Sequence, residues 1–458
     1  MEEMTGLDAR FLYTETAVAH MHTIKVAVVD VSARPDVLTP ELFVELLAGR
    51  LDRMPILRRR VVPVPHQLGA PLLVDDPEFD LARHVRLRTA APPGGDRELA
   101  QIVADVAAEP LPRDRPLWEL TVVDGLAQGQ MAFVVKIHHS LADGVAAVAM
   151  LMNAFMIDDS AAVVEPFRPE PLPSNRVLYH SAVRGAIHWA LTLPAFIVQT
   201  WSALVRGSRA RRIETIRVFG PFAGRRTQLS AALSPARTFA MVGLPMADLA
   251  AAKAAAGVTL NDVFLAVCGG GLRRYLGRIN DLPDTTLVAS VPVATQTERQ
   301  RLSGNHVDNL FLPIRSDLAD PMERLHSIHD ATVASRRIRA AFGHDLFELR
   351  AGFMPPALLV TGARLASWRR LAGQVRPPLN LVASNVAGPR VPLELDGGVV
   401  TALYSVGPIL EGIGLNITAW SYVDTMYVSL LGCPQSLPDP WVLAEDLKGA
   451  LAEILDHL

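Results

Sequence analysis

A pair of adjacent histidines is the strongest candidate for chemistry in this chain. His138 and His139 are followed by Ser-Leu-Ala and then by Asp143 and Gly144. A neutral imidazole can remove a proton from a hydroxyl group near physiological pH, and acylation of an alcohol requires this step. An Asp shortly after the histidines can cap or pair within the turn, and Gly relieves backbone strain there. The segment therefore predicts a general base where a strand passes into a helix.

The two histidines cannot share one role. Adjacent residues of a strand point to opposite faces of the sheet, so one imidazole should face a cleft while the other braces the core. His-x-x-x-Asp spacing is weak evidence by itself, because His326 and Asp330 show it too. That second pair lies in the charged, helically periodic segment 322–341, which we interpret as a solvated helix face. The doubled His and the trailing Gly favour 138–144 as the site.

Other chemistries lack their sequence signatures. The chain has no Gly-x-Ser-x-Gly elbow, no Gly-Lys-Ser/Thr phosphate loop and no His-Glu-x-x-His motif. Gly269-Gly270-Gly271 lacks the spacing of a dinucleotide fingerprint, so we predict a role in helix packing or in a flexible turn. Cys268 and Cys433 are the only cysteines, which excludes a disulfide framework and a Cys-rich zinc site. We expect no metal site and no resident cofactor.

Composition narrows the class of protein. The chain has 458 residues, with 44 Lys and Arg against 47 Asp and Glu, so the formal net charge is −3. This balance argues against a nucleic-acid binder that relies on a global basic surface. Hydrophobic residues make up 50% and charged residues 20%, which indicates a folded chain long enough for two domains. The first residues lack the basic start and apolar run of a secretory signal, so we expect a cytoplasmic protein.

Strand and helix patterns alternate along both halves of the chain, which predicts an α/β (α+β) fold. In the first half we expect strands at 21–31, 117–125 and 131–139, and helices from Thr39, over 95–109 and over 144–155. In the second half we expect helices at 245–256, 259–275 and 438–458, with strands at 286–293, 309–315, 379–386, 399–406 and within 414–431. The predicted domains are 1–157 and 237–458. The linker between them, 158–236, begins with a proline-rich stretch.

The segment Gly185–Val205 contains no charged residue and is bracketed by Arg184 and Arg206. Its length would allow a membrane span, but several polar residues and a proline dilute its hydrophobicity. Trp189, Trp201 and the arginines that follow are typical of an interfacial helix. We narrowly favour a buried or packing helix over an interfacial amphipathic helix, and a true span is the least favoured interpretation.

Further sequence blocks accompany the doubled histidine. They are Leu7–Leu12 with Met21-His22, Pro116-Leu117-Trp118, Asn261-Asp262-Val263, Gly304–Asn309 and Ser384–Pro389. Pro116–Trp118 by itself is typical of a strand start with a packed aromatic. Together with His138–Gly144, which matches the HHxxxDG motif of CoA-dependent acyltransferases and condensation domains, the blocks resemble the bacterial wax ester synthase/diacylglycerol acyltransferase (WS/DGAT) family. Ala387 departs from the family pattern, which usually has Pro there.

The resemblance implies two domains like that of chloramphenicol acetyltransferase, each a mixed sheet with helices, and a substrate tunnel between them. Acyl-CoA would enter one mouth as co-substrate, and the alcohol would enter the other. His139 would be the general base, and its protonated form would then protonate the departing CoA thiolate. Asp143 would turn away from the tunnel and organise the loop, while His138 braces the core and Gly144 relieves strain in the turn. Asn261 is our candidate donor to the tetrahedral intermediate, although a helix-start role is equally open.

We therefore expect an O-acyltransferase that moves a long-chain acyl group from acyl-CoA to diacylglycerol, giving triacylglycerol, or to a fatty alcohol, giving a wax ester. Because these substrates are lipids, we expect peripheral association with the inner face of the plasma membrane or with lipid droplets. Two alternatives stay open: a condensation-type or polyketide-associated acyltransferase that uses a carrier-protein thioester, and a catalytically silent lipid-binding relative. The lack of a carrier domain in the chain weighs against the first alternative. The intact His139, Asp143 and Gly144 weigh against the second.

Overall fold

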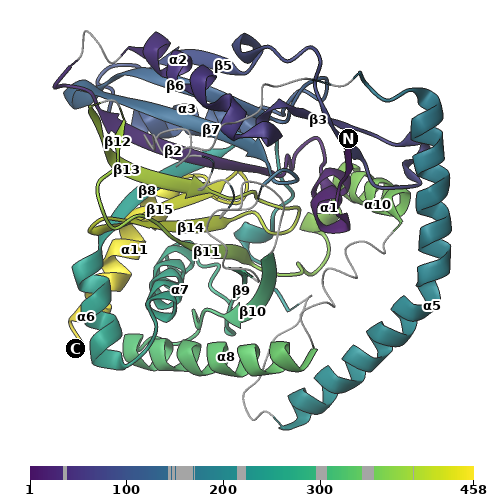
Figure 1. Ribbon diagram of the computed structural model, residues 1–458. Coiled ribbons are helices and arrows are strands. Elements are labelled where there is room, and N and C mark those ends of the chain that lie inside the picture. The colour runs from purple at the N-terminus through teal and green to yellow at the C-terminus, as the bar shows by residue number, and fades with distance from the viewer. Residues whose placement is uncertain are drawn as a thin grey trace.

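The computed structural model describes residues 1–34, 39–142, 146, 150, 169, 171–213, 223–294, 307–342, 355–395 and 397–458. Two six-stranded mixed sheets form the body of the molecule, and a small three-stranded sheet lies beside the first (Figure 1). The predicted α/β class with two mixed sheets is confirmed. The helix expected at 144–155 and the proline-rich stretch after it lie largely outside the described residues.

The N-terminal sheet carries the doubled histidine and has the strand order β12-β13-β2-β7-β6-β5. Its strands are β2 (His22–Asp30), β5 (Val85–Thr89), β6 (Trp118–Leu126), β7 (Gln130–His138), β12 (Glu394–Leu395) and β13 (Gly398–Val406). One face packs against helix α2 (Pro40–Arg50), and the other packs against α3 (Asp96–Ala108). β2 and β7 are central and buried on both faces, so their sequences are almost continuously apolar.

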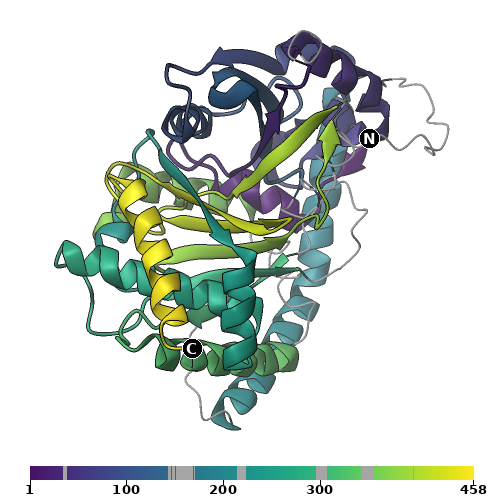
Figure 2. The ribbon, with the colours of Figure 1, turned by 90° about the vertical axis from the view of Figure 1, so that its left-hand side faces the viewer.

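The C-terminal sheet has the order β10-β9-β11-β14-β15-β8 and forms the larger core (Figure 2). Its strands are β8 (Thr238–Pro245), β9 (Val288–Ala294), β10 (Val307–Pro313), β11 (Leu381–Ala387), β14 (Asn416–Tyr422) and β15 (Thr425–Gly432). The helices packed against it are α6 (Met246–Ala256), α7 (Leu260–Arg278), α8 (Pro321–Phe342) and α11 (Pro440–Leu455). Local signals set the boundary between α6 and α7. Gly257 ends α6 in the left-handed region at φ 67°, and Thr259 caps the start of α7.

The C-terminal half of the chain contributes two strands to the N-terminal sheet. β12 and β13 lie within the predicted C-terminal domain, yet β13 pairs antiparallel with β2, from Val399 opposite Asp30 to Val406 opposite Ile24. Residues 394–406 therefore complete the N-terminal sheet. Periodicity marks 399–406 as a strand but says nothing of its partner, which is why the sequence placed it with its neighbours along the chain.

A small sheet and two short helices lie beside the N-terminal sheet, on the side along which α5 runs (Figure 1). Their bounds are β1 (Glu2–Glu3), β3 (Arg59–Val62), β4 (Leu72–Asp75), α1 (Gly6–Thr14) and α10 (Pro356–Trp368). α1 and α10 are in contact although they are far apart in sequence (Figure 1). This packing brings a C-terminal helix to the edge of the site described below.

The long helix α5 (Asn175–Ile213) follows the outside of the molecule and bends along its length (Figure 1). It contains Pro194, a residue that bends helices because it lacks the backbone N–H. Among the described residues, its segment Asn175–Ala210 is the single helix long and apolar enough to cross a membrane, and only 11% of its tested 18-residue window is buried. The helix is therefore not buried, but it does pack along one side against α8.

The glycine triplet is a helix-packing device. Gly269, Gly270 and Gly271 lie inside α7 and are fully buried. A Cβ at Gly269 would collide with the Ile314 carbonyl oxygen, and one at Gly271 would lie 2.6 Å from Leu447 Cδ2. Small side chains let α7 approach α11 and the end of β10 this closely, so the structure confirms the packing role.

We predict that Gly269→Ala destabilises the protein, because the added methyl has no space beside the Ile314 carbonyl. Overpacking of this kind costs about 1–3 kcal/mol. Gly277→Ala is the matched control: it lies in the same helix, its Cβ would meet nothing within 4 Å, and the higher helix propensity of Ala should add up to about 1 kcal/mol. Urea unfolding measures both variants. Equal stability of the two would contradict this account of the triplet.

Candidate active site

The end of β7 places the two histidines in different environments. The His138 backbone N–H donates to the Leu117 carbonyl at 2.9 Å, and the His139 N–H donates to the Met21 carbonyl at 2.8 Å. His138 is 0% exposed, whereas His139 is only partly buried. One imidazole thus braces the core as expected. Whether the other acts as the base stays a prediction.

His138 is held as a neutral imidazole of defined tautomer. The Ser140 backbone N–H donates to its Nδ1 at 3.1 Å, and Ser140 Oγ lies 2.7 Å from the same atom. Nδ1 is therefore an acceptor, and the ring proton sits on Nε2. Nε2 lies 3.7 Å from Glu15 Oε2, and Glu15 also pairs with Arg113. Burial lowers the pKa of His138 well below its ordinary value, so the ring stays uncharged at neutral pH.

The His139 ring stacks on Phe11 of α1. The ring centroids are 4.2 Å apart and the planes differ by 12°. Stacking engages the face of the imidazole and so does not compete with in-plane hydrogen bonds of its nitrogens. A ring held in this way keeps the orientation that proton transfer needs. The contribution of Phe11 was missed by sequence reasoning, although Phe11 lies in the quoted block Leu7–Leu12.

Three buried histidines form a cluster beside the motif. His22 faces His138 directly across the β2–β7 pair, and their ring centroids are 6.1 Å apart. His20 stacks on His22 at 5.5 Å, and its Nε2–H donates to the Ala108 carbonyl at 3.0 Å. Neither ring nitrogen of His22 has a partner among the described residues. Burial, with help from Arg237, lowers the pKa of His20 to about 4, and burial lowers the pKa of His22 still more clearly.

These lowered pKa values predict a pH-dependent stability. A histidine in the unfolded chain has a pKa near 6.5. Below that pH the unfolded chain binds protons, whereas the native cluster, with its lowered pKa values, stays neutral. The free energy of unfolding should therefore be constant above about pH 6.5 and fall by about 1.4 kcal/mol per pH unit for each such histidine below it. Urea unfolding between pH 8 and 5 measures this slope.

His22→Met tests one member of the cluster. The variant should be about as stable as the parent at pH 8, because Met removes two unpartnered buried nitrogens at similar size. Below pH 6.5 its free energy of unfolding should fall less steeply with pH, by the contribution of one histidine. His326→Gln changes an exposed histidine on α8 and should leave the slope unchanged. If His22→Met kept the full slope, His22 would not be held neutral.

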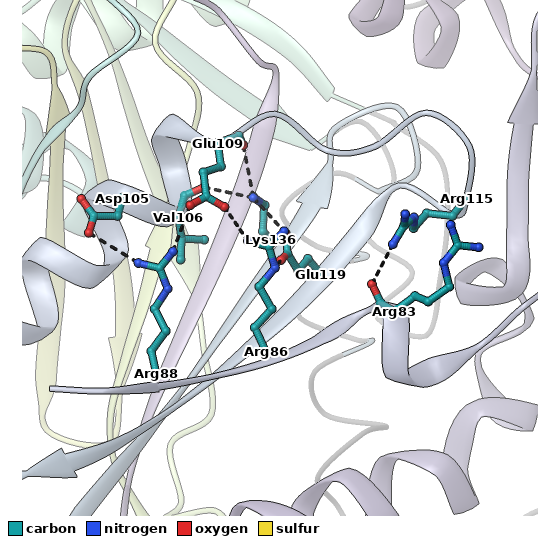
Figure 3. Close-up of polar contacts among 9 residues, drawn as sticks. All are labelled: Arg83, Arg86, Arg88, Asp105, Val106, Glu109, Arg115, Glu119 and Lys136. Atoms are coloured by element: carbon teal, nitrogen blue, oxygen red, sulfur yellow. Dashed lines mark hydrogen bonds and ion pairs between the residues drawn. The ribbon is translucent and has the colours of Figure 1, made fainter.

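A buried lysine anchors the strand behind the histidines (Figure 3). Lys136 is 0% exposed, and its Nζ donates to the carbonyls of Val106 at 3.1 Å and Glu109 at 3.2 Å, near the end of α3. The same ammonium lies 3.1 Å from Glu119 Oε2 on β6. Arg86, on β5, pairs with both Glu119 and Glu109. Burial lowers the pKa of Lys136, while Glu119 opposes that shift by favouring the charged form.

The other residues singled out in the sequence divide into predicted site residues and a structural pair. Asp143 and Gly144 lie outside the described residues. Asn261 lies in the first turn of α7 and is partly buried. Among the described residues, no hydrogen bond or ring contact joins it to the histidines, so its role stays a prediction. Leu117 and Trp118 have the structural role suggested above: Leu117 accepts the His138 N–H, and the Trp118 indole donates to the Leu57 carbonyl at 2.7 Å.

Asp262, next to Asn261, has a role that sequence reasoning missed. Its carboxylate accepts from the Thr259 backbone N–H at 3.0 Å, forming a capping box. It also lies 2.9 Å from His329 Nδ1 on α8. Burial raises the pKa of Asp262, but the hydrogen bonds from His329 and Thr259 outweigh it and lower the value. Thr-x-x-Asp at the start of a helix was the available signal.

The described part of the chain contains no cluster of His, Cys, Asp or Glu that could hold a metal ion. The imidazoles of His138 and His139 are the titratable groups at this strand end. His139 is a stacked imidazole at a strand end, and His138 is a neutral one that fixes the backbone beside it. Such an arrangement suits general base catalysis.

The fold and this site define a class: acyltransferases with two mixed sheets and a doubled histidine at a strand end. The wax ester synthase/diacylglycerol acyltransferase from Marinobacter aquaeolei VT8 matches with a TM-score of 0.67 and 25% identity, over 99% of this chain and 98% of that one. The first condensation domain of the CDA synthetase shares the fold at 18% identity, with a TM-score of 0.59 over 99% of this chain and 96% of that one.

The sequence comparisons identify the family. Residues 4–264 match the wax ester synthase/diacylglycerol acyltransferase catalytic domain, and residues 303–455 match the WS/DGAT C-terminal domain. A Mycobacterium tuberculosis H37Rv protein, provisionally named a diacylglycerol O-acyltransferase, is 35% identical over 457 residues, covering 100% of this chain and 96% of its own. A second one is 34% identical over 471 residues, covering 99% and 97%. The chain belongs to the WS/DGAT family, as its motifs predicted.

Proposed function

We propose that this protein transfers a long-chain acyl group from acyl-CoA to the hydroxyl of diacylglycerol or of a fatty alcohol. The observation that carries the proposal is the stacked, partly exposed His139 beside the buried, neutral His138 in a chain of this family. His139 takes the hydroxyl proton as the oxygen attacks the thioester carbonyl carbon. The carbon–sulfur bond then breaks, and the imidazolium returns the proton to the CoA thiolate. The products are an ester and free CoA.

The main rival donor is a thioester on a carrier protein. The likeness to condensation domains supports only the fold, because the identity is 18%. Similarity at 34–35% identity to two proteins provisionally named diacylglycerol O-acyltransferases favours the free CoA ester and a lipid acceptor. Incubation with labelled palmitoyl-CoA and either diacylglycerol or hexadecanol, without any carrier protein, separates the two donors and identifies the acceptor.

We predict that His139→Ala folds normally and loses most of its turnover. A positioned general base contributes about 10²–10⁴-fold to the rate. His138→Ala should act first on stability, because it removes a buried ring and leaves the Ser140 backbone N–H without its acceptor. Single-turnover rates and thermal melts on both variants separate the loss of catalysis from the loss of stability. If folded His139→Ala retained more than about a tenth of the parental rate, the base assignment would be wrong.

We also propose that the protein works at a lipid surface, peripherally on the cytoplasmic face of the plasma membrane or on lipid droplets. Support comes from α5, where Leu191 is 76% and Trp201 70% exposed. The helix carries six arginines and no acidic residue between 175 and 213. An exposed apolar helix with tryptophans and arginines matches an interfacial helix, and its positive charge favours anionic lipids.

Two pairs of substitutions test the lipid contact. The double variant Val198→Ser and Trp201→Ser should lose most flotation with anionic vesicles, because it removes apolar side chains that are 67% and 70% exposed. Leu87→Ser with Val391→Ser is the matched control, since these residues are 57% and 65% exposed and lie outside α5. Flotation should also weaken at high salt. Turnover of a short soluble alcohol should stay unchanged in both. Equal flotation of the two double variants would refute the contact.

A further inference from the structure

Helix α10 turns an apolar face outward. Leu358, Leu365 and Trp368 are 67%, 50% and 72% exposed. At about 100° per residue, the three side chains project within an arc of about 80°. Val360 projects from the opposite side of the helix and is 8% exposed. A surface helix ordinarily buries its apolar side chains and exposes polar ones, so an outward apolar face marks a place where something else binds.

The chain around this face is positively charged. Between residues 355 and 376 it contains no Asp or Glu and four exposed arginines, namely Arg364, Arg369, Arg370 and Arg376. The guanidinium carbon of Arg369 lies 4.8 Å from the centroid of the Trp368 ring, so a cation and an exposed indole share one place at the helix end. Apolar side chains bordered by arginines fit a surface that is apolar inside and anionic at its boundary.

The apolar face of α10 belongs to an element that lies near α5. Both helices pack against residues 65–67, and α10 also packs against α1 (Figure 1). At this junction the rings of Tyr179 on α5 and His66 have their centroids 6.4 Å apart. From α1, the Tyr13 hydroxyl donates to the Gly69 carbonyl at 3.3 Å. One loop therefore connects the proposed lipid contact on α5 with the α1–α10 pair.

The α1–α10 pair also borders the candidate active site. α1 carries Phe11, whose ring stacks on His139. Arg113 pairs with Glu15, the residue that follows α1. Burial lowers the pKa of Arg113 to about 10, and the charge of Arg364 on α10 adds to this shift. A surface that touched α10 would therefore lie close to the side of the site that α1 covers.

We propose that the apolar face of α10 inserts into an anionic lipid surface and, together with α5, forms a two-helix docking surface beside the active site. The inference rests on the proposed function and adds the place where the lipid surface meets the site. Two contacts on one rigid body reinforce each other, because the second forms at high effective concentration once the first is made. A lipid acceptor dissolved in that surface is then presented on the α1 side of His139.

The charge of the face favours lipid over a second copy of the chain as its occupant. A twofold contact through this face would place the same arginines of two copies against each other. Like charges brought together at an interface cost binding free energy, whereas lipid phosphates attract each arginine.

A reporter cysteine tests the insertion directly. The two native cysteines, Cys268 and Cys433, are buried, so a thiol-reactive NBD fluorophore should label an exposed cysteine placed at Leu365→Cys. We expect its emission to shift to shorter wavelength and to rise when phosphatidylglycerol vesicles are added, because the dye leaves water. Leu87→Cys is the matched control, since Leu87 is 57% exposed on β5. Its emission should stay unchanged.

Substitutions measure how much the face contributes to binding. Leu365→Ser with Trp368→Ser should weaken partition onto phosphatidylglycerol vesicles about tenfold or more, because two apolar side chains no longer leave water. The control pair Leu87→Ser with Val391→Ser should leave partition unchanged. Replacing Arg364, Arg369 and Arg370 with Gln should weaken it about 10²-fold at low salt, and less at high salt.

The outcomes separate this inference from the proposed function. Unchanged NBD emission at position 365 would overturn the inference, and the α5 contact would still stand if the vesicles bound the protein. Emission that changed with protein concentration, without vesicles, would identify a second copy as the occupant and would also overturn it. Insertion at position 365 without ester product in any assay would keep the docking surface and overturn the acyl-transfer proposal.

Discussion

A single buried ammonium, that of Lys136, holds together the elements that present the two histidines. A charge inside a protein is tolerated only when it is paired and hydrogen-bonded, so its contacts specify where its neighbours lie. The neighbours here are two carbonyls near the end of α3 and the carboxylate of Glu119 on β6. Lys136 precedes His138 by two residues on the same face of β7. Any slip of that strand would leave the charge unpaired and move both histidines, so the register of the site depends on this contact.

The two faces of β7 have different tasks. On the α3 side lie His138, its cross-strand partner His22 and the stacked His20, all kept neutral by burial. On the α2 side the row Phe133, Val135 and Ile137 borders an apolar pocket. Because successive side chains of a strand point to opposite faces, the polar and the apolar residues of β7 are separated by the strand itself.

Strands β2 and β7 and helix α5 are all rich in apolar residues, but the strands are buried and the helix is largely exposed. The apolar residues of β2 and β7 are buried because sheet pairing places helices over both faces. The apolar residues of α5 remain largely exposed, although the helix packs against α8 and against residues 65–67. A large exposed apolar surface on a folded protein marks a place where something else binds. We propose that this occupant is a lipid surface, because arginines and tryptophans are typical of interfacial helices.

Local signals in the sequence determined the elements and the candidate base. Thr39 and Thr259 cap helices, Gly257 ends one, and the apolar runs before His138 form a buried strand, as predicted. These features depend on neighbours along the chain, so the sequence displays them directly. Tertiary structure alone decided that residues 394–406 complete the N-terminal sheet, that His22 faces His138, and that α5 lies exposed. Pairing and packing between distant segments decide these features, and the periodicity of one segment carries no record of its partner.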